Sequence, residues 1–171
     1  MKRPVLIVLL LALAVPCLAF GQAQTAPPPK PGPEIERLGF LVGTWKTEST
    51  SSASMITWEW FVGGFGLVGR EEGTGPGGKY SYLRVMTFDP NEKVYTHYMM
   101  TSLGPGGALA KGTVAENTWH WEWDGMVSAK PAKYRFTVVE VSPTATASKV
   151  ELSVAGGPWT VTAEGKGTKV K

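Results

Sequence analysis

Apolar and polar side chains alternate with a period of two along most of the chain from Trp45 onward. Ile56, Trp58 and Trp60, for example, are separated from one another by single polar residues. Such alternation is typical of a β-strand with one buried face. The pattern predicts ten strands, at 45–49, 56–62, 65–72, 80–88, 94–102, 108–115, 118–124, 133–141, 149–154 and 159–166.

Turn-forming residues separate these predicted strands. Gly63-Gly64, Asp89-Pro90-Asn91 and Gly156-Gly157 favour the tight turns that join antiparallel neighbours. A parallel crossover would need about a dozen residues or more between strands. Closure of a long antiparallel meander removes its unpaired edges. We therefore predict an all-β fold, a closed or nearly closed antiparallel up-and-down barrel of ten strands.

The residues before the first strand have a different pattern. In Glu34–Val42, the side chains of Ile35, Leu38 and Leu41 recur at helical spacing after a proline, which predicts a short helix of about two turns. Residues 24–33 are rich in proline, and this composition favours an extended linker.

The N-terminus carries the pattern of an export signal. Lys2 and Arg3 precede an apolar run from Val5 to Val15, and this run is shorter than the about 20 apolar residues that span a bilayer. Small residues indicate cleavage after Ala23, with Gly21 as the alternative. We predict an exported protein, periplasmic or secreted, with no stable membrane span in the mature chain and with three segments: a signal peptide at 1–23, a Pro-rich linker at 24–33 and a barrel domain at 34–171.

Composition and charge exclude several classes of function. Charged residues make up 18% of the chain and hydrophobic residues 43%, which fits one globular domain. The net charge of +3 falls to +1 when Lys2 and Arg3 are removed, so binding to nucleic acid is not expected. The single cysteine, Cys17, lies in the predicted signal peptide, so no disulfide or thiol site is expected in the mature chain.

The alternation also predicts which side chains face the interior of the barrel. Charged or polar positions such as Glu59, His120, Glu122, Asp124, Arg135 and Lys166 are expected outside. An interior with many indole rings is either a packed core or the lining of a ligand cavity, and ten strands leave more room than eight. The predicted inward set is Trp45, Ile56, Trp58, Trp60, Trp119, Trp121, Trp123, Phe136, Val138, Val150, Leu152, Trp159 and Val161.

The orientation of Arg84 is ambiguous in the sequence. If Arg84 shares an inner face with Tyr82, its guanidinium is placed to hold the carboxylate of a fatty-acid-like ligand. If the Leu83 and Val85 face is the inner one, Arg84 extends along the outer surface instead, and the cost of burying an unpaired charge favours this orientation. The candidate cavity-lining residues are Trp58, Trp60, Trp119, Trp121, Trp123, Tyr82 and Arg84.

Neither of the two histidines predicts a metal or catalytic site. His97 is a conceivable axial ligand for haem, and a neutral histidine within a strand is the alternative. His120 and Glu122 share a strand face, but two ligands do not make a metal site. The sequence has no nucleophile-elbow, zinc-protease or phosphate-binding motif. We therefore predict no enzymatic activity, no catalytic residue, no metal and no cofactor, with haem through His97 as the alternative.

A set of short motifs resembles one protein family. Gly43-Thr44-Trp45 forms a Gly-x-Trp directly after the predicted helix, as at the start of lipocalins and related barrels. The other motifs are Trp58-Glu59-Trp60-Phe61-Val62-Gly63-Gly64-Phe65, Phe88-Asp89-Pro90 with Lys93-Val94-Tyr95, Gly112-Thr113-Val114 before Asn117-Thr118-Trp119, and Trp159 before Glu164-Gly165-Lys166. Over residues 34–169 they resemble a family of exported bacterial lipocalin-like proteins with a calycin-type barrel, domain of unknown function 1579.

The resemblance implies a barrel fold to which no activity is assigned. It implies that Gly43 and Trp45 are structural residues at one barrel end, where Trp45 closes the barrel beneath a capping N-terminal helix. Lipocalins often carry an arginine on a late strand that packs on this tryptophan. In this sequence the same region offers Lys166 or Lys169.

Together these observations predict a small-molecule binding module, which takes an apolar or amphipathic ligand into an aromatic-lined barrel. The alternative is a non-enzymatic interaction or structural protein with a packed barrel core and a protein partner.

Overall fold

The computed structural model describes residues 29–171. The predicted signal peptide at 1–23 and the first half of the predicted linker, residues 24–28, lie outside the described residues. Residues 29–32 have no regular secondary structure. Within the described part of the chain, no helix is both long enough and apolar enough to cross a membrane.

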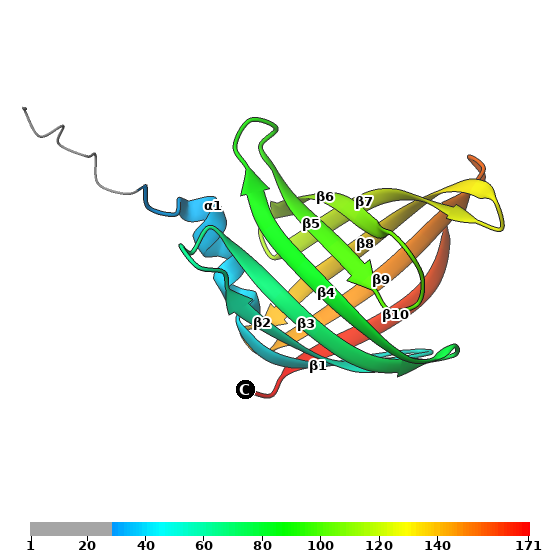
Figure 1. Cartoon of the computed structure of the whole chain (residues 1–171), viewed down its shortest axis with the longest axis horizontal. Helices are drawn as coiled ribbons and strands as arrows, with labels where there is room; N and C mark the ends of the chain where they lie inside the picture. The colour runs from blue at the N-terminus through cyan, green and yellow to red at the C-terminus, as the bar shows by residue number, and fades with distance from the viewer. Residues whose placement is uncertain (1–28) are drawn as a thin grey trace, which may run out of the picture.

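A short helical segment precedes the barrel. Helix α1 (Pro33–Glu36) continues directly into the 3-10 helix η1 (Arg37–Leu41). Proline at the first helical position costs no hydrogen bond, because the N–H groups of a first turn have no partner within the helix. Ile35 and Leu38 are buried, as their helical spacing predicts. The segment lies at one end of the barrel (Figure 1).

Ten antiparallel strands between residues 43 and 169 form a closed barrel. Each strand pairs with its neighbours in the sequence, and β1 pairs with β10 to complete the ring (Figure 1). This topology confirms the predicted up-and-down barrel. The strands are β1 (Gly43–Ser49), β2 (Ala53–Trp60), β3 (Gly66–Gly75), β4 (Gly78–Asp89), β5 (Val94–Thr101), β6 (Gly107–Ala115), β7 (Thr118–Val127), β8 (Lys130–Ser142), β9 (Ala145–Val154) and β10 (Thr160–Lys169).

The inner face of the barrel follows the predicted alternation along most strands. Trp58, Trp119 and Trp121 are each less than 5% exposed. Gly112 pairs with Trp121 on the neighbouring strand, and a Cβ at Gly112 would come within 2.5 Å of the indole ring. The glycine therefore leaves room for the ring to lie flat against the backbone of β6.

The predicted orientation is wrong for Trp159 and Val161. Both side chains are exposed, at 37% and 54%. The pairing of β10 with β9 is shifted by a β-bulge between Val161 and Ala163. A bulge adds one residue to one strand and so reverses which side chains point inward beyond it. Ala163, on the other side of the bulge, lines the interior.

Candidate functional site

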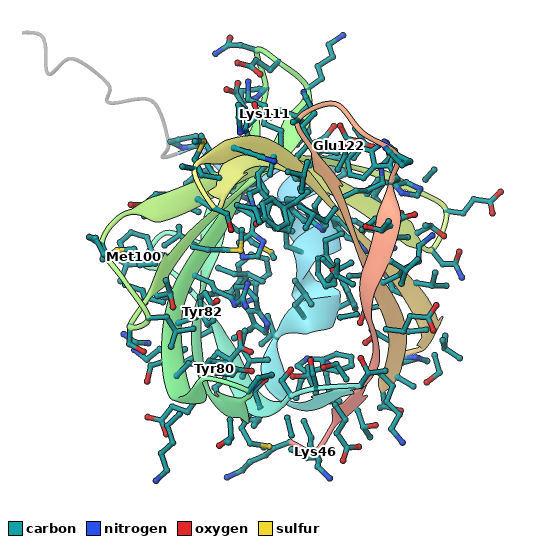
Figure 2. All side chains as sticks on the ribbon, turned by 90° about the vertical axis from the view of Figure 1, so that its right-hand side faces the viewer. Lys46, Tyr80, Tyr82, Met100, Lys111 and Glu122 are labelled. Atoms are coloured by element: carbon teal, nitrogen blue, oxygen red, sulfur yellow. The ribbon has the colours of Figure 1, made fainter. Side chains whose placement is uncertain are left out.

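A cavity of about 570 Å³ lies inside the barrel. Side chains from all ten described strands line it, together with Phe40 and Leu41 of η1. Figure 2 looks into the barrel from the end opposite the helical segment, and shows Tyr80 and Tyr82 inside the ring of strands and Met100 outside. Six of the predicted lining residues border the cavity: Trp58, Trp119, Trp121, Trp123, Tyr82 and Arg84.

Trp60 is the candidate that the structure places away from the cavity lining. It stands at the last position of β2 and is 40% exposed. A Cβ at Gly39 in η1 would lie 3.5 Å from its ring. Trp60 has the same alternation as Trp58, but the strand carries it past the cavity to the end that η1 covers.

Trp45 lies beneath the helical segment at this covered end of the barrel. Its indole Nε1 donates a hydrogen bond of 2.7 Å to the carbonyl oxygen of Leu41, and its ring is 3% exposed. Lys169 is placed 5.0 Å above the Trp45 ring and donates to the carbonyl of Phe40 at 2.8 Å. Lys169, rather than Lys166, thus provides the late-strand cation that packs on this tryptophan.

Gly43 begins β1 with a φ of 118°, in the region that favours glycine. A Cβ at this position would come within 2.4 Å of the Lys171 carbonyl oxygen, which accepts a hydrogen bond from Thr44. The Gly-x-Trp motif therefore combines a backbone position that needs glycine with a ring that covers the end of the barrel.

A second set of contacts holds the helical segment in place. The Phe40 ring stacks on Trp119 with centroids 5.7 Å apart. Arg37 lies 5.2 Å from the Trp119 ring centre and pairs with Glu140 at 2.6 Å. The Trp119 indole also donates to the Glu140 carboxylate. These charge-assisted bonds join η1 to β7 and β8, so this end of the cavity is filled by side chains.

Five rings form one side of the cavity. Trp119 and Trp121 are parallel within 4°, at a centroid separation of 6.0 Å. Trp123 stacks on Tyr134 with centroids 5.1 Å apart. Such offset stacking gives a large apolar surface that suits planar or apolar molecules. We call these rings the aromatic wall: Trp119, Trp121 and Trp123 of β7 with Tyr134 and Phe136 of β8.

Five polar side chains form a second feature of the lining. Each comes from a different strand along the run β1 to β5, and each borders the cavity. We call them the polar cluster: Thr47, Ser54, Glu71, Arg84 and His97.

The polar cluster is held together by hydrogen bonds. Ser54 Oγ donates to Glu71 Oε1 at 2.7 Å, so the hydroxyl of Thr47 donates to Ser54. Arg84 Nε donates to Glu71 Oε2 at 2.7 Å, and Arg84 Nη2 pairs with the same oxygen. Arg84 Nη1 lies 3.5 Å from His97 Nε2. Within residues 29–171, every buried side-chain nitrogen or oxygen has a hydrogen-bond partner.

The structure thus places Arg84 on the inner face of β4, and the expectation that an outward orientation is favoured is wrong. Leu83 and Val85 are the outward residues, at 40% and 39% exposed. That expectation rested on the cost of an unpaired buried charge. Glu71 supplies the missing countercharge from β3, and the side chains of Arg84 and Glu71 are 18% and 10% exposed.

Glu71 is the site residue that sequence reasoning missed. It stands between Arg70 and Glu72, where three charged residues in a row hide the alternation. The sequence does offer one signal, the apolar residue Leu67, which stands four positions before Glu71 and therefore on the same face of the strand. Leu67 is fully buried in the structure, so this face is the inner one. Both neighbours of Glu71 are exposed, which leaves Glu71 as the inward member of the run.

His97 is 3% exposed and lies between two indole rings. Its ring centre is 5.4 Å from that of Trp121 and 6.0 Å from that of Trp58. Burial, together with the nearby Arg84 cation, lowers the pKa of His97 well below its ordinary value of 6.5. A guanidinium only donates hydrogen bonds, so Nε2 is the acceptor and the ring proton sits on Nδ1.

These surroundings do not fit His97 as an axial haem ligand. Its Nε2 faces the Arg84 guanidinium, and an iron atom at Nε2 would have to take the place of that cation. His120 and Glu122 lie on the exterior, where Glu122 pairs with Arg135 at 2.9 Å. Among residues 29–171, no group of three or more His, Cys, Asp or Glu residues is placed to hold a metal ion.

Comparison with known proteins adds information about the fold. No family model matches this sequence, and no curated protein is found to be similar to it. Rv2717c from M. tuberculosis is similar over 83% of this chain and 100% of its own, with a TM-score of 0.56 and 11% identity. The S-type phycobiliprotein lyase CpeS from Guillardia theta is similar over 80% of this chain and 92% of its own, with a TM-score of 0.48 and 14% identity.

At such low identity the likeness to Rv2717c concerns the fold alone. The closed barrel and its N-terminal helix fit the lipocalin-like calycin fold. Membership of domain of unknown function 1579 stays a prediction, because no family model matches the chain.

Proposed function

We propose that this protein is an exported binding module that takes an apolar or amphipathic small molecule into the barrel. The observation that carries the proposal is the cavity of about 570 Å³ with its two contrasting sides. Small-molecule sites typically enclose about 300 to 1,000 Å³ and combine apolar walls with a few placed polar groups. The aromatic wall and the polar cluster have this composition.

The cavity also separates this proposal from the alternative of an interaction or structural protein. A barrel that serves only as a scaffold gains stability from a filled interior, since each void loses packing contacts. Here the side chains fill the end beneath η1, while Trp123, Tyr82 and Arg84 border open space. The architecture therefore favours a ligand in that space.

The hydrogen bonds within the polar cluster favour binding over catalysis. Ser54 donates to Glu71, and this carboxylate is held in an ion pair with Arg84, so it serves as the countercharge of a cation rather than as a free base for the hydroxyl. A nucleophile needs an adjacent general base to act. We propose that these groups orient a ligand.

Binding can be tested with an uncharged fluorescent apolar dye and two matched variants. Trp123→Ala removes a ring of the aromatic wall, and we expect it to weaken dye binding by about tenfold, which corresponds to 1.4 kcal/mol. Trp159→Ala is the control, because Trp159 lies outside the barrel, 4.3 Å from Arg135. We expect Trp159→Ala to leave the dissociation constant within about a factor of two, or 0.4 kcal/mol.

Equal loss of binding in both variants, or saturable binding by neither variant nor the wild type, would count against the proposal. Extraction of protein from its native compartment, followed by mass spectrometry, then identifies the natural ligand. The intact mass of the same sample tests export, because cleavage after Ala23 leaves a chain that begins at Gln24. An uncleaved chain would contradict that part of the proposal.

A further inference from the structure

The charges of the cavity specify the chemical class of ligand more closely. We infer that the cavity selects an uncharged molecule whose polar group accepts hydrogen bonds, such as a ketone or an alcohol, and discriminates against carboxylates. The inference rests on the proposed binding function. It contrasts with the interpretation of Arg84 as a clamp for a fatty-acid carboxylate.

The positive charge of Arg84 is already matched inside the barrel. Its Nε and Nη2 atoms both bond to Glu71 Oε2, so one side of the guanidinium already holds a carboxylate. A carboxylate placed beside Arg84 would lie close to the Glu71 carboxylate, and two anions in a partly buried site repel each other strongly. His97 does not offset this repulsion, because burial keeps its ring neutral.

Arg84 nevertheless keeps hydrogen-bonding capacity for a neutral partner. A guanidinium has five N–H groups. Two of them bond to Glu71 and one points to His97, so in the described part of the chain two remain on Nη1 and Nη2. The Tyr82 ring lies 4.7 Å from the guanidinium carbon and supports it from one side. A ligand carbonyl or hydroxyl can accept from the free N–H groups without bringing a second negative charge.

The charged residues at the open end of the barrel do not change this balance. Glu48 pairs with Lys46 at 2.8 Å and with Lys166 at 3.8 Å, and the side chains of Glu48 and Lys166 are 40% and 71% exposed. Glu164 also borders the cavity and is exposed. The ion pair of Arg84 with Glu71 is therefore the charged group that a ligand meets inside the barrel.

The aromatic wall defines the rest of the ligand. Trp121 is 3% exposed and contacts His97, so it joins the polar cluster to the aromatic wall. The Trp123 and Tyr134 pair lies further along β7 and β8 and presents stacked ring faces to the cavity. A molecule with its acceptor group at Arg84 therefore has its apolar or planar body against indole rings.

Two matched ligand pairs test the inference by isothermal titration calorimetry. One pair is naphthyl methyl ketone and naphthoate, and the other is a long-chain methyl ketone and the fatty acid of the same length. We expect the wild type to bind each ketone at least about tenfold tighter than its carboxylate partner, the ratio that 1.4 kcal/mol corresponds to. Equal or tighter binding of the carboxylates overturns the inference and leaves the proposed function intact. Failure of all four molecules to bind folded protein counts against the proposed function itself.

A single substitution should reverse this preference. Glu71→Gln keeps an acceptor for Ser54 and Arg84 but removes the countercharge, so we expect carboxylate affinity to rise by at least about tenfold. The control is Glu72→Gln, which makes the same change one residue away on the exposed face of β3. We expect Glu72→Gln to bind each ketone more tightly than its carboxylate partner, as the wild type does. Unchanged carboxylate affinity in folded Glu71→Gln overturns the inference.

A measurement on the wild type keeps the inference testable if Glu71→Gln does not fold. Only the neutral acid form of naphthoate should bind, so its apparent affinity should rise by about tenfold for each pH unit of acidification towards the pKa of the ligand. The ketone has no titratable group, so it controls for protonation of Glu48, Glu71, Glu164, His97 or Lys166. The inference is overturned if the affinities for ketone and naphthoate change in parallel with pH, or if the affinity for naphthoate does not rise as the pH is lowered.

Discussion

The two sides of the cavity are assembled in different ways. The polar cluster takes one side chain from each of the strands β1 to β5, and its members are joined in a chain from Thr47 to His97. The aromatic wall takes its rings from only two paired strands, β7 and β8. In the first case function depends on the register of five strands, and in the second on alternation within one hairpin.

This difference has an energetic consequence. A buried polar network is favourable only when its members are satisfied together, so loss of one member leaves others unpaired. Rings in an apolar wall contribute mainly through the area that each one buries. Substitutions within the polar cluster should therefore have strongly non-additive effects on the free energy of unfolding, whereas substitutions of separate rings in the aromatic wall should have nearly additive effects.

Removal of one charge from the polar cluster should reduce stability more than any other change. Arg84→Met leaves the Glu71 carboxylate, 10% exposed, without its countercharge, and we expect the free energy of unfolding to fall by about 3 to 5 kcal/mol. Urea denaturation measures this change. The double variant Glu71→Met with Arg84→Met should recover most of it, because replacement of a whole buried pair by apolar side chains is often neutral. A double variant no more stable than Arg84→Met would show that the pair does not act as a unit.

The next effect comes from the aromatic wall. Trp121→Ala should lower the free energy of unfolding by about 3 kcal/mol, at the low end for a buried tryptophan because the ring already borders a cavity. Addition of Arg84→Met to Trp123→Ala tests the comparison. Trp123 stacks on Tyr134 and not on His97, which is the neighbour that Trp121 and Arg84 share, so the losses from Trp123→Ala and Arg84→Met should add to within about 0.5 kcal/mol. A strong coupling would mean that the two sides form one network.

The smallest effect is the pH dependence that His97 contributes. In the unfolded chain a histidine binds a proton near pH 6.5, whereas the folded protein keeps the lowered pKa of His97 and stays unprotonated there. The unfolded state therefore binds more protons as pH falls below 6.5. Stability should decrease by up to about 1.4 kcal/mol per pH unit until the folded pKa is reached.

Equilibrium unfolding of the wild type and His97→Asn between pH 7 and 5 measures this contribution, a window chosen around the histidine value of about 6.5. In His97→Asn, the free energy of unfolding should no longer show this part of the pH dependence. His120→Asn, which replaces the exposed histidine, should retain it. A slope that survives in His97→Asn would assign the pH dependence to other groups.

The elements and inward rings were predictable because their signals are local. The alternation in Trp119, Trp121 and Trp123 assigns the inner face of β7 by itself. The same reasoning failed at Trp159 and Val161, because a bulge in β10 changes the alternation without a clear mark in the sequence. It also could not assign Arg84, since apolar residues occur on both faces of β4.

Short-range patterns were enough to specify the ten-strand meander, its helical start and the aromatic side of the barrel, since each depends on residues a few positions apart. The inward orientation of Arg84 is settled only in the folded barrel, because its countercharge, Glu71, comes from a neighbouring strand. Folding likewise determines that the interior is a cavity that holds an ion pair of balanced charge. The size of that space and the pairing of its charges depend on how ten strands register around a closed ring, which no short stretch of sequence encodes.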